Sequence, residues 1–392
     1  MADKKKKTVS YESTRLADYT YDNSIERGSM DLPFALLALL LLTIGVIMVL
    51  SASYARAYYD LEGDTGGNAT YYFVRQTLFA LCGIGVMFVC SRFPMGFYRR
   101  MSWMAFMISL ALLAAVILIG VVGGGSRRWI DLGFTTFQPS ELAKISLVMF
   151  FALRLSRNRD DLTSVKGLVP YVVAVGAIAV LLALEPHWSA IMIILIISLV
   201  MLFVGGAPIK WFVGGLASAA GLMGIAWLCF DYIRNRIAGW LDPFSDMADT
   251  GYQVVQSLYA VGSGGLLGLG LGNSRQKYLY LPEEHNDYIF AVLCEELGFI
   301  GAMLVLTLFA LLIIRGYWLA MHARDRYSCL MGVGITTLIA MQVILNVCVV
   351  TNLLPSTGVS LPLFSYGGTA LLIQMAEIGI ILSLSRDIPE KR

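Results

Sequence analysis

Residues 281–290 read LPEEHNDYIF, so three carboxylates and one histidine stand directly before an apolar run. Asp287 lies at the start of a helix predicted over 288–314. The helix N-terminus would favour its ionised form, whereas burial would raise its pKa. A carboxylate in this position could accept a proton from a hydroxyl group. The alternative is structural, because Asn286 or Asp287 before an apolar run is an ordinary helix cap.

Several basic residues could bind an anionic head group such as a pyrophosphate. They are Arg127, Arg128, Lys144, Arg275 and Lys277. Arg127 and Arg128 could instead anchor the chain at a membrane interface by extending their charged ends into water. Glu141 and Lys144 are three residues apart on one helix face, which predicts an ion pair within a buried helix. Lys144 could still reach a ligand from that position.

Two further patterns resemble ligand sites but fit no established one. The stretch AVGSGGLLGLGLGN at 260–273 lacks the G-x-x-x-x-G-K-[ST] pattern and a βαβ context. Its glycines therefore indicate tight turns or close helix approach. His285 stands near Glu283, Glu284 and Asp287, but this spacing fits no known zinc pattern. We expect no metal site and no tightly bound cofactor, and leave open an exchangeable Mg²⁺ or Mn²⁺ on a substrate's pyrophosphate.

The composition indicates an all-α integral membrane protein. The chain has 392 residues, of which 57% are hydrophobic and only 14% are charged. A soluble globular domain carries about 25% charged residues, so the deficit favours a chain that crosses the membrane many times. The net charge of +2 gives no indication of nucleic-acid binding. The six cysteines form no C-x-x-C pair and are interpreted as apolar filler.

Apolar runs of spanning length recur through the chain. They predict ten transmembrane helices, near residues 32–52, 72–91, 102–123, 137–154, 168–184, 188–205, 211–230, 288–314, 329–350 and 363–385. Lys and Arg gather in alternate connections and in both tails, so the positive-inside rule places both termini in the cytoplasm. A large extracytoplasmic loop, 231–287, then joins helices seven and eight. We expect a disordered cytoplasmic tail at 1–31, a membrane domain at 32–386 and a short cytoplasmic tail at 387–392.

Four polar segments fall on the outer side of this topology. They are 123–144, 184–190, 252–298 and 351–370. Ionisable groups at membrane depth are costly and indicate function by default. A single shared site at the outer leaflet is therefore the economical interpretation.

Motifs in these segments together resemble the SEDS family of bacterial membrane proteins (shape, elongation, division and sporulation), the group of FtsW, RodA and SpoVE. They are SRRWIDLG, FQPSELAK, EPHWS, SGGLLGLGLGNSRQKYLYLPEEHNDYIFAVLCEELG and LPLFSYGGTALL. The resemblance runs over about 32–386. It implies a peptidoglycan glycosyltransferase in the bacterial cytoplasmic membrane, which polymerises lipid II on the extracytoplasmic side. It also implies a class B penicillin-binding protein as partner, with lipid II, other divisome membrane proteins and membrane lipids.

The resemblance also implies roles for residues. Asp287 occupies the catalytic aspartate of the family motif H-x-D-[FY]-I-F, which makes it the expected general base. Residues expected to bind the pyrophosphate or head group are Arg127, Arg128, Lys144, Lys277 and His285. Residues expected to support the site are Glu141, Trp129, Gln256, Ser263, Gly264, Ser365, Tyr366 and Gly367. The usual Q/E-P-D turn is EPH here, so His187 puts a carboxylate role at that position in doubt.

Alternative functions remain open. A lipid II flippase would also explain ten helices, intramembrane charges and glycine-broken segments. The polar clusters gather on the outer side, however, which favours an enzyme over a path through both leaflets. A scaffold that only recruits the transpeptidase would leave LPEEHNDYIF without a purpose. Within the family, the chain is most like FtsW, which implies cell division, with a RodA-like elongation or SpoVE-like sporulation role as alternatives.

Overall fold

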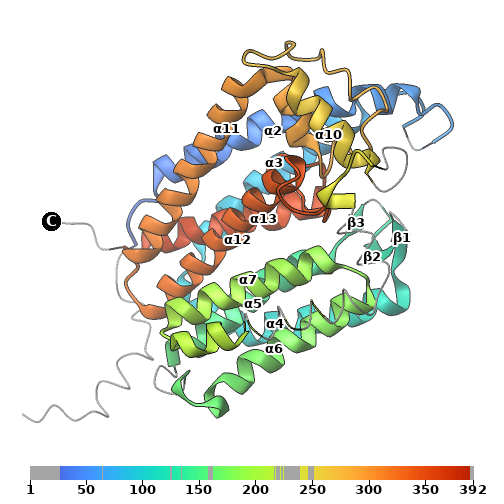
Figure 1. Cartoon of the computed structure of the whole chain (residues 1–392). Helices are drawn as coiled ribbons and strands as arrows, with labels where there is room; N and C mark the ends of the chain where they lie inside the picture. The colour runs from blue at the N-terminus through green and yellow to red at the C-terminus, as the bar shows by residue number, and fades with distance from the viewer. Residues whose placement is uncertain are drawn as a thin grey trace, which may run out of the picture.

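The computed structural model describes residues 27–388, apart from 64, 124–125, 134, 158–161, 216, 218–220, 222–223, 225–238 and 246–250. The chain forms a bundle of long helices with a small sheet at one end (Figure 1). The helices are α2 (Leu32–Tyr59), α3 (Tyr71–Arg92), α4 (Met95–Ile119), α5 (Pro139–Arg157), α6 (Val165–Leu184), α7 (Trp188–Gly205), α10 (Tyr252–Ser263), α11 (Ile289–Met321), α12 (Arg326–Val350) and α13 (Gly368–Arg386).

The small sheet marks one end of the bundle, called the sheet end below. Its strands β1 (Val121–Gly123), β2 (Ser126–Asp131) and β3 (Thr136–Phe137) are antiparallel in the order β1-β2-β3. The hydroxyl of Thr369 at the start of α13 donates to the carbonyl of Thr136 in β3 at 2.9 Å. The first turn of α13 therefore lies at the sheet end.

Eight of the described helices are long and apolar enough to cross a membrane, which confirms a multi-pass membrane protein. They are α2, α3, α4, α6, α7, α11, α12 and α13. The helix α5 is less apolar because it carries Glu141, Lys144, Arg154 and Arg157, yet most of its residues are buried, and it packs against α4, α7 and α12. Charged residues are tolerated at such depth where protein surrounds them. The helix predicted at 211–230 lies mostly outside the described residues.

One boundary prediction is wrong for a clear physical reason. The helix predicted over 102–123 begins seven residues earlier, at Met95, directly after Pro94. The prediction treated Arg99 as part of a charged loop. In the structure its guanidinium forms an ion pair with Asp325 and lies over the Tyr327 ring, 5.0 Å from the centroid. These partners allow the arginine to lie within the helix.

The two ends of the described chain meet at the end of the bundle opposite the sheet. The amide of Gly28 donates to the carbonyl of Arg386 at 2.9 Å. The side chain of Arg27 pairs with Asp387, with Nε and Oδ1 2.7 Å apart. The segment before α2 and the end of α13 are thus on the same side of the bundle.

Candidate active site

Asp287 lies at the sheet end, one residue before the N-cap of α11, where two elements fix its backbone and cover its side chain. The Asn346 amide of α12 donates to the Asp287 carbonyl and to the Val359 carbonyl, both at 2.7 Å. The loop after α12 therefore lies against this residue. Gly358 has φ +66°, and a Cβ there would lie 3.0 Å from Asp287 Oδ2. Glycine at this position lets the loop approach the carboxylate.

The environment of Asp287 favours a proton acceptor. The residue is half-buried, and burial raises its pKa to about 6. The negative charge of Glu283 raises the pKa further, and the positive charge of Arg128 opposes the rise. Within the described ranges no hydrogen bond occupies the Asp287 carboxylate oxygens. The carboxylate is therefore ionised at neutral pH and available to a substrate hydroxyl group.

Arg128 is the cation whose charge lowers the pKa of Asp287. It lies on β2, and its Nη2 donates to the Pro186 carbonyl at 2.5 Å. Nε of the same side chain is 3.5 Å from the Glu185 carbonyl oxygen. The sheet and the EPH turn thus come together beside Asp287. Arg127, the next residue on the strand, is exposed to solvent.

Glu185 and His187 are buried next to Arg128, and their burial disfavours the charged form of each side chain. Burial raises the pKa of Glu185 to about 7, although Arg128 opposes the rise. Burial lowers the pKa of His187 to about 3, and the charges of Arg128 and Lys144 lower it further. His187 is therefore neutral at physiological pH. Within the described residues neither carboxylate oxygen of Glu185 has a hydrogen-bond partner.

The Glu141–Lys144 ion pair is confirmed. Lys144 Nζ lies 2.7 Å from Glu141 Oε2, and both side chains are buried in α5. This pair is predictable because its members are three residues apart on one helix. Lys144 also lowers the pKa of His187, so its charge reaches the EPH turn.

His285 is buried beside Asp287 and packs against aromatic rings. Its ring centroid lies 4.7 Å from that of Tyr72 and 5.7 Å from that of Tyr366. Its Nδ1 is 3.8 Å from Glu284 Oε1, and Glu284 accepts two hydrogen bonds from Arg56 at 2.7 and 2.8 Å. Burial opposes a low pKa for Glu284, but His285 and Arg56 lower it overall. His285 thus lies in a packed cluster.

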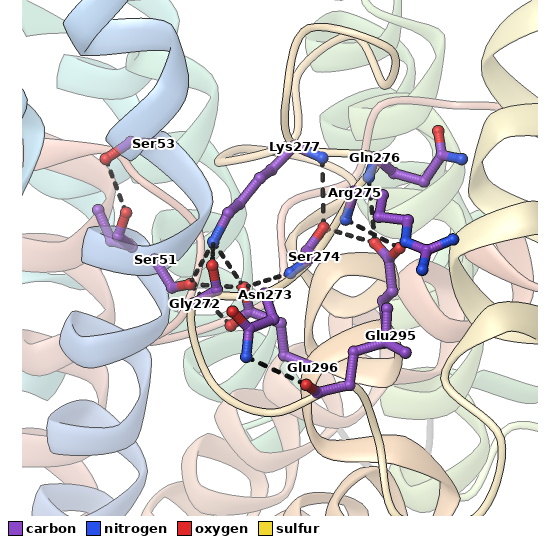
Figure 2. Close-up of polar contacts among 12 residues, drawn as sticks. Ser51, Ser53, Gly272, Asn273, Ser274, Arg275, Gln276, Lys277, Glu295 and Glu296 are labelled. Carbon is purple, nitrogen blue, oxygen red and sulfur yellow. Dashed lines mark hydrogen bonds and ion pairs between the residues drawn. The ribbon is translucent and has the colours of Figure 1, made fainter.

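Lys277 is buried and has three oxygen partners (Figure 2). Its Nζ donates to Gly272 O at 2.6 Å, Glu296 Oε1 at 2.9 Å and Ser51 Oγ at 3.2 Å. Ser51 lies on α2 and also donates to both Glu296 oxygens. The Lys277 amine is therefore engaged in an internal ion pair with Glu296, and its contacts do not include Arg128 or Asp287.

Two residues of the loop before α13, Ser365 and Tyr366, bond directly to the backbone just before Asp287. The Ser365 hydroxyl donates to the Asn286 carbonyl at 2.7 Å. The Tyr366 amide donates to the His285 carbonyl at 2.9 Å. The Gly367 amide donates to Gln76 Oε1 at 3.3 Å, which joins this loop to α3. These contacts bring Ser365 and Tyr366 next to Asp287.

The other supporting residues lie further away. Trp129 is half-buried on β2, where it pairs with Val121. Gln256 is half-buried in α10. Ser263 donates to Glu295 at 3.3 Å, and Gly264 packs closely against the Cys294 carbonyl. Ser263 and Gly264 thus contact α11 and do not reach Asp287.

Sequence reasoning missed four polar residues on the surrounding helices. They are Ser51, Arg56, Gln76 and Asn346. Each of them is a polar or charged residue within an apolar run, and this pattern could have identified them in the sequence. Arg56 was overlooked because α2 was predicted to end at residue 52 and in fact continues to Tyr59. In the described part of the chain no three His, Cys, Asp or Glu side chains gather as metal ligands.

Comparison with known proteins gives the chain a family. Residues 31–389 match the family model FTSW_RODA_SPOVE, described as cell cycle protein. The chain is 41% identical over 365 residues to stage V sporulation protein E of Bacillus subtilis, with 92% of this chain and 98% of that protein covered. It is 36% identical over 374 residues to a probable peptidoglycan glycosyltransferase FtsW of Hahella chejuensis, with 94% and 93% covered.

Solved structures share the fold. One is a chain from work on the coordination of polymerization and crosslinking by a peptidoglycan synthase complex. Its TM-score is 0.78 at 26% identity, with 92% of this chain and 99% of that chain covered. The other is the rod shape determining protein RodA of Thermus thermophilus, with TM-score 0.68, 26% identity and 92% and 98% covered. The chain belongs to the cell cycle protein family of FtsW, RodA and SpoVE.

Proposed function

We propose that this chain is an inverting peptidoglycan glycosyltransferase that joins lipid II units into β-1,4 glycan strands, with Asp287 as general base. The half-buried Asp287 carboxylate, beside Gly358 and within electrostatic reach of Arg128, carries the assignment of the site. The reaction class is supported by relatives from Hahella chejuensis and Geobacter sulfurreducens that are named probable peptidoglycan glycosyltransferase FtsW.

The reaction needs one base and a stabilised leaving group. The 4-hydroxyl of an acceptor N-acetylglucosamine attacks the anomeric carbon of a lipid-linked N-acetylmuramic acid. The bond from that carbon to the pyrophosphate oxygen breaks, a β-1,4 bond forms, and Asp287 takes the hydroxyl proton. Arg128 is proposed to stabilise the pyrophosphate charge, together with Arg127 beside it on β2 and Lys144, whose charge reaches His187. An exchangeable Mg²⁺ or Mn²⁺ would be held mainly by the pyrophosphate oxygens.

The proposed topology has ten membrane helices, with both termini in the cytoplasm and the sheet end outside. Residues 27–28 and 386–387 meet at the opposite end of the bundle, which supports an even number of crossings. The loop 231–287 then lies outside the cytoplasmic membrane, where it leads to Asp287. In this proposed topology the site faces the side where the glycan product is needed.

The proposed partner is a class B penicillin-binding protein that cross-links the product. A structurally similar chain belongs to a peptidoglycan synthase complex that coordinates polymerization and crosslinking, which supports this pairing. Other divisome membrane proteins and membrane lipids complete the proposed surroundings. We propose cell division as the process, because the matching family model is described as cell cycle protein and a relative named FtsW is 36% identical. Sporulation is the second candidate, because the sporulation relative is 41% identical, and elongation is the third, because RodA shares the fold.

A lipid II flippase is the second candidate, and the break at Gly298 in α11 favours it. Broken helices near the bilayer midplane are typical of transporters. Here, however, the segment 264–272 fills the break through backbone hydrogen bonds. Because these hydrogen bonds occupy the backbone groups at the break, those groups are not free to line a polar pathway for a lipid head group.

One experiment distinguishes the two candidates. The purified chain is mixed with its class B partner, lipid II and Mg²⁺ or Mn²⁺, and the products are separated on a gel. In parallel, fluorescent lipid II is followed across vesicles that contain the chain alone. We expect glycan polymer in the first assay and no accelerated crossing in the second. Crossing without polymer would replace the enzyme proposal by the flippase.

The rate of polymerisation is expected to fall as the pH is lowered through about 6, the pKa to which burial raises Asp287. Above this value Asp287 is ionised and can accept the proton. Well below it the carboxylate is protonated, and the rate should drop about tenfold per pH unit. Values of kcat/KM for lipid II between about pH 5 and pH 8, which report the pKa values of the free enzyme, would show this limb, and a flat profile would contradict the assignment.

A further inference from the structure

α11 is broken at Gly298, where the backbone leaves the helical region with φ 66° and ψ −171°. The glycine-rich segment 264–272 inserts at this break. Four hydrogen bonds join them, each given from amide to carbonyl: Leu269 to Glu295 (3.0 Å), Gly270 to Glu296 (3.0 Å), Phe299 to Gly265 (2.9 Å) and Ile300 to Leu266 (3.1 Å). A break in a membrane helix is tolerated where other protein groups satisfy its backbone in this way.

Glycine is required on both sides of this contact. A Cβ at Gly268 would overlap the Glu296 carbonyl, and a Cβ at Gly298 would overlap the Gly268 amide. Both residues also have positive φ, +79° and +66°, which side chains rarely adopt. Residues 264–272 together with 294–300 are called the interlock below. The sequence prediction that these glycines allow close approach is confirmed.

Side chains extend the interlock into the turn 274–277 (Figure 2). Glu295 is fully buried and accepts hydrogen bonds from the Arg275 and Gln276 amides at 3.0 and 3.3 Å. It also accepts a hydrogen bond from the Ser274 hydroxyl at 2.5 Å. A buried carboxylate with several donors of this kind is held firmly. The chain therefore leaves the interlock with the turn 274–277 fixed to α11.

We propose that the interlock is the positioning device for Asp287, an inference that rests on the proposed function. The segment 278–288 leaves the turn 274–277 and re-enters α11 a few residues before Glu295. Both of its ends are therefore attached to the same rigid unit. This unit sets where the Asp287 carboxylate lies relative to Arg128, so Gly268 and Glu295 are positioning residues without touching the substrate. A misplacement of about 1 Å can cost about a hundredfold in rate.

The test compares two glycine substitutions in the same segment. Gly268→Ala introduces both positive-φ strain and the overlap with Glu296, whereas Gly272→Ala has φ +86° with no atom within 4 Å of its Cβ. Gly272→Ala therefore measures the strain alone. We expect Gly268→Ala to lower kcat about 10- to 100-fold and Gly272→Ala about threefold or less. The KM for lipid II and the acid limb near pH 6 should stay unchanged in both.

Hydrogen exchange provides a readout that does not depend on activity. Gly268→Ala should speed amide exchange in 278–288, and Gly272→Ala should not. Ser274→Ala removes one donor to Glu295 and leaves the Arg275 and Gln276 amide donors in place, so we expect a smaller misplacement of Asp287 and a loss of kcat of about three- to tenfold. If Gly268→Ala does not fold, kcat and amide exchange in Ser274→Ala test the positioning role instead. Wild-type exchange and kcat in both Gly268→Ala and Ser274→Ala would overturn the inference.

The failure of this inference differs from failure of the proposed function. If wild-type protein with its partner makes no polymer, the proposed function falls whatever the exchange data show. If wild-type protein makes polymer and Asp287→Asn makes none, the function stands. Equal kcat for Gly268→Ala and Gly272→Ala would then remove only the positioning role of the interlock.

Discussion

Asp287→Asn is expected to lower the rate of lipid II polymerisation by about 10²–10⁴-fold, the usual contribution of a general base. Asparagine keeps the shape of the side chain and the contact with Gly358, but it cannot accept the hydroxyl proton. Binding of lipid II and of the class B partner should persist, because the substitution removes one charge without changing the packing. Gel analysis of glycan products and a pulldown with the partner would measure the two properties separately.

Glu283→Gln is the matched control for this substitution. Glu283 is an exposed carboxylate four residues earlier, and its charge raises the pKa of Asp287. Removing that charge should move the acid limb of the rate to lower pH and leave the rate at about pH 8 close to that of wild type. If Asp287→Asn and Glu283→Gln both make polymer at the wild-type rate, Asp287 is not the base and the other carboxylates at the sheet end need testing.

The predictable parts of the site are those set by local spacing. Glu141 and Lys144 could be paired because three residues separate them on one helix. Arg56 and Glu284 are 228 residues apart, and their contact depends on how α2 packs against the segment 278–288. Lys277 shows where prediction from the sequence fails. Its sequence context suggested a cation that binds the head group, but in the structure it pairs with Glu296. A charge pattern does not show which side chains the fold buries.

The fold likewise has parts that local sequence predicts and parts that depend on long-range packing. Apolar length located the helices, because spanning a membrane requires a long apolar run. It could not reveal the break at Gly298, since an apolar run resumes directly after this glycine and the sequence therefore resembles one continuous helix. The break depends on the segment 264–272, which supplies the missing hydrogen bonds. The glycines of that segment could be seen in the sequence. Their contact partner, α11 around Gly298, could not.

Lys277→Met is expected to destabilise the protein by about 3–5 kcal/mol, the usual cost of leaving a buried charge without its partner. Glu296 has a fully buried side chain, and Lys277 is the cation paired with it within the described residues. Ser51 and the Ser274 amide would still donate to the carboxylate, but neither carries a positive charge. Thermal unfolding of the detergent-solubilised protein should show a lower transition temperature. Lys210→Met, at an exposed lysine, should shift it little.

The double variant Lys277→Met/Glu296→Gln separates the cost of an unpaired charge from the loss of packing. Glutamine keeps an oxygen for Ser51 and the Ser274 amide but carries no charge to leave unpaired. Replacing both members of a buried ion pair by neutral residues is often close to neutral in stability. The double variant should therefore be more stable than Lys277→Met. If it is equally unstable, the contribution of Lys277 comes from its bond to the Gly272 carbonyl and its packing, not from its charge on Glu296.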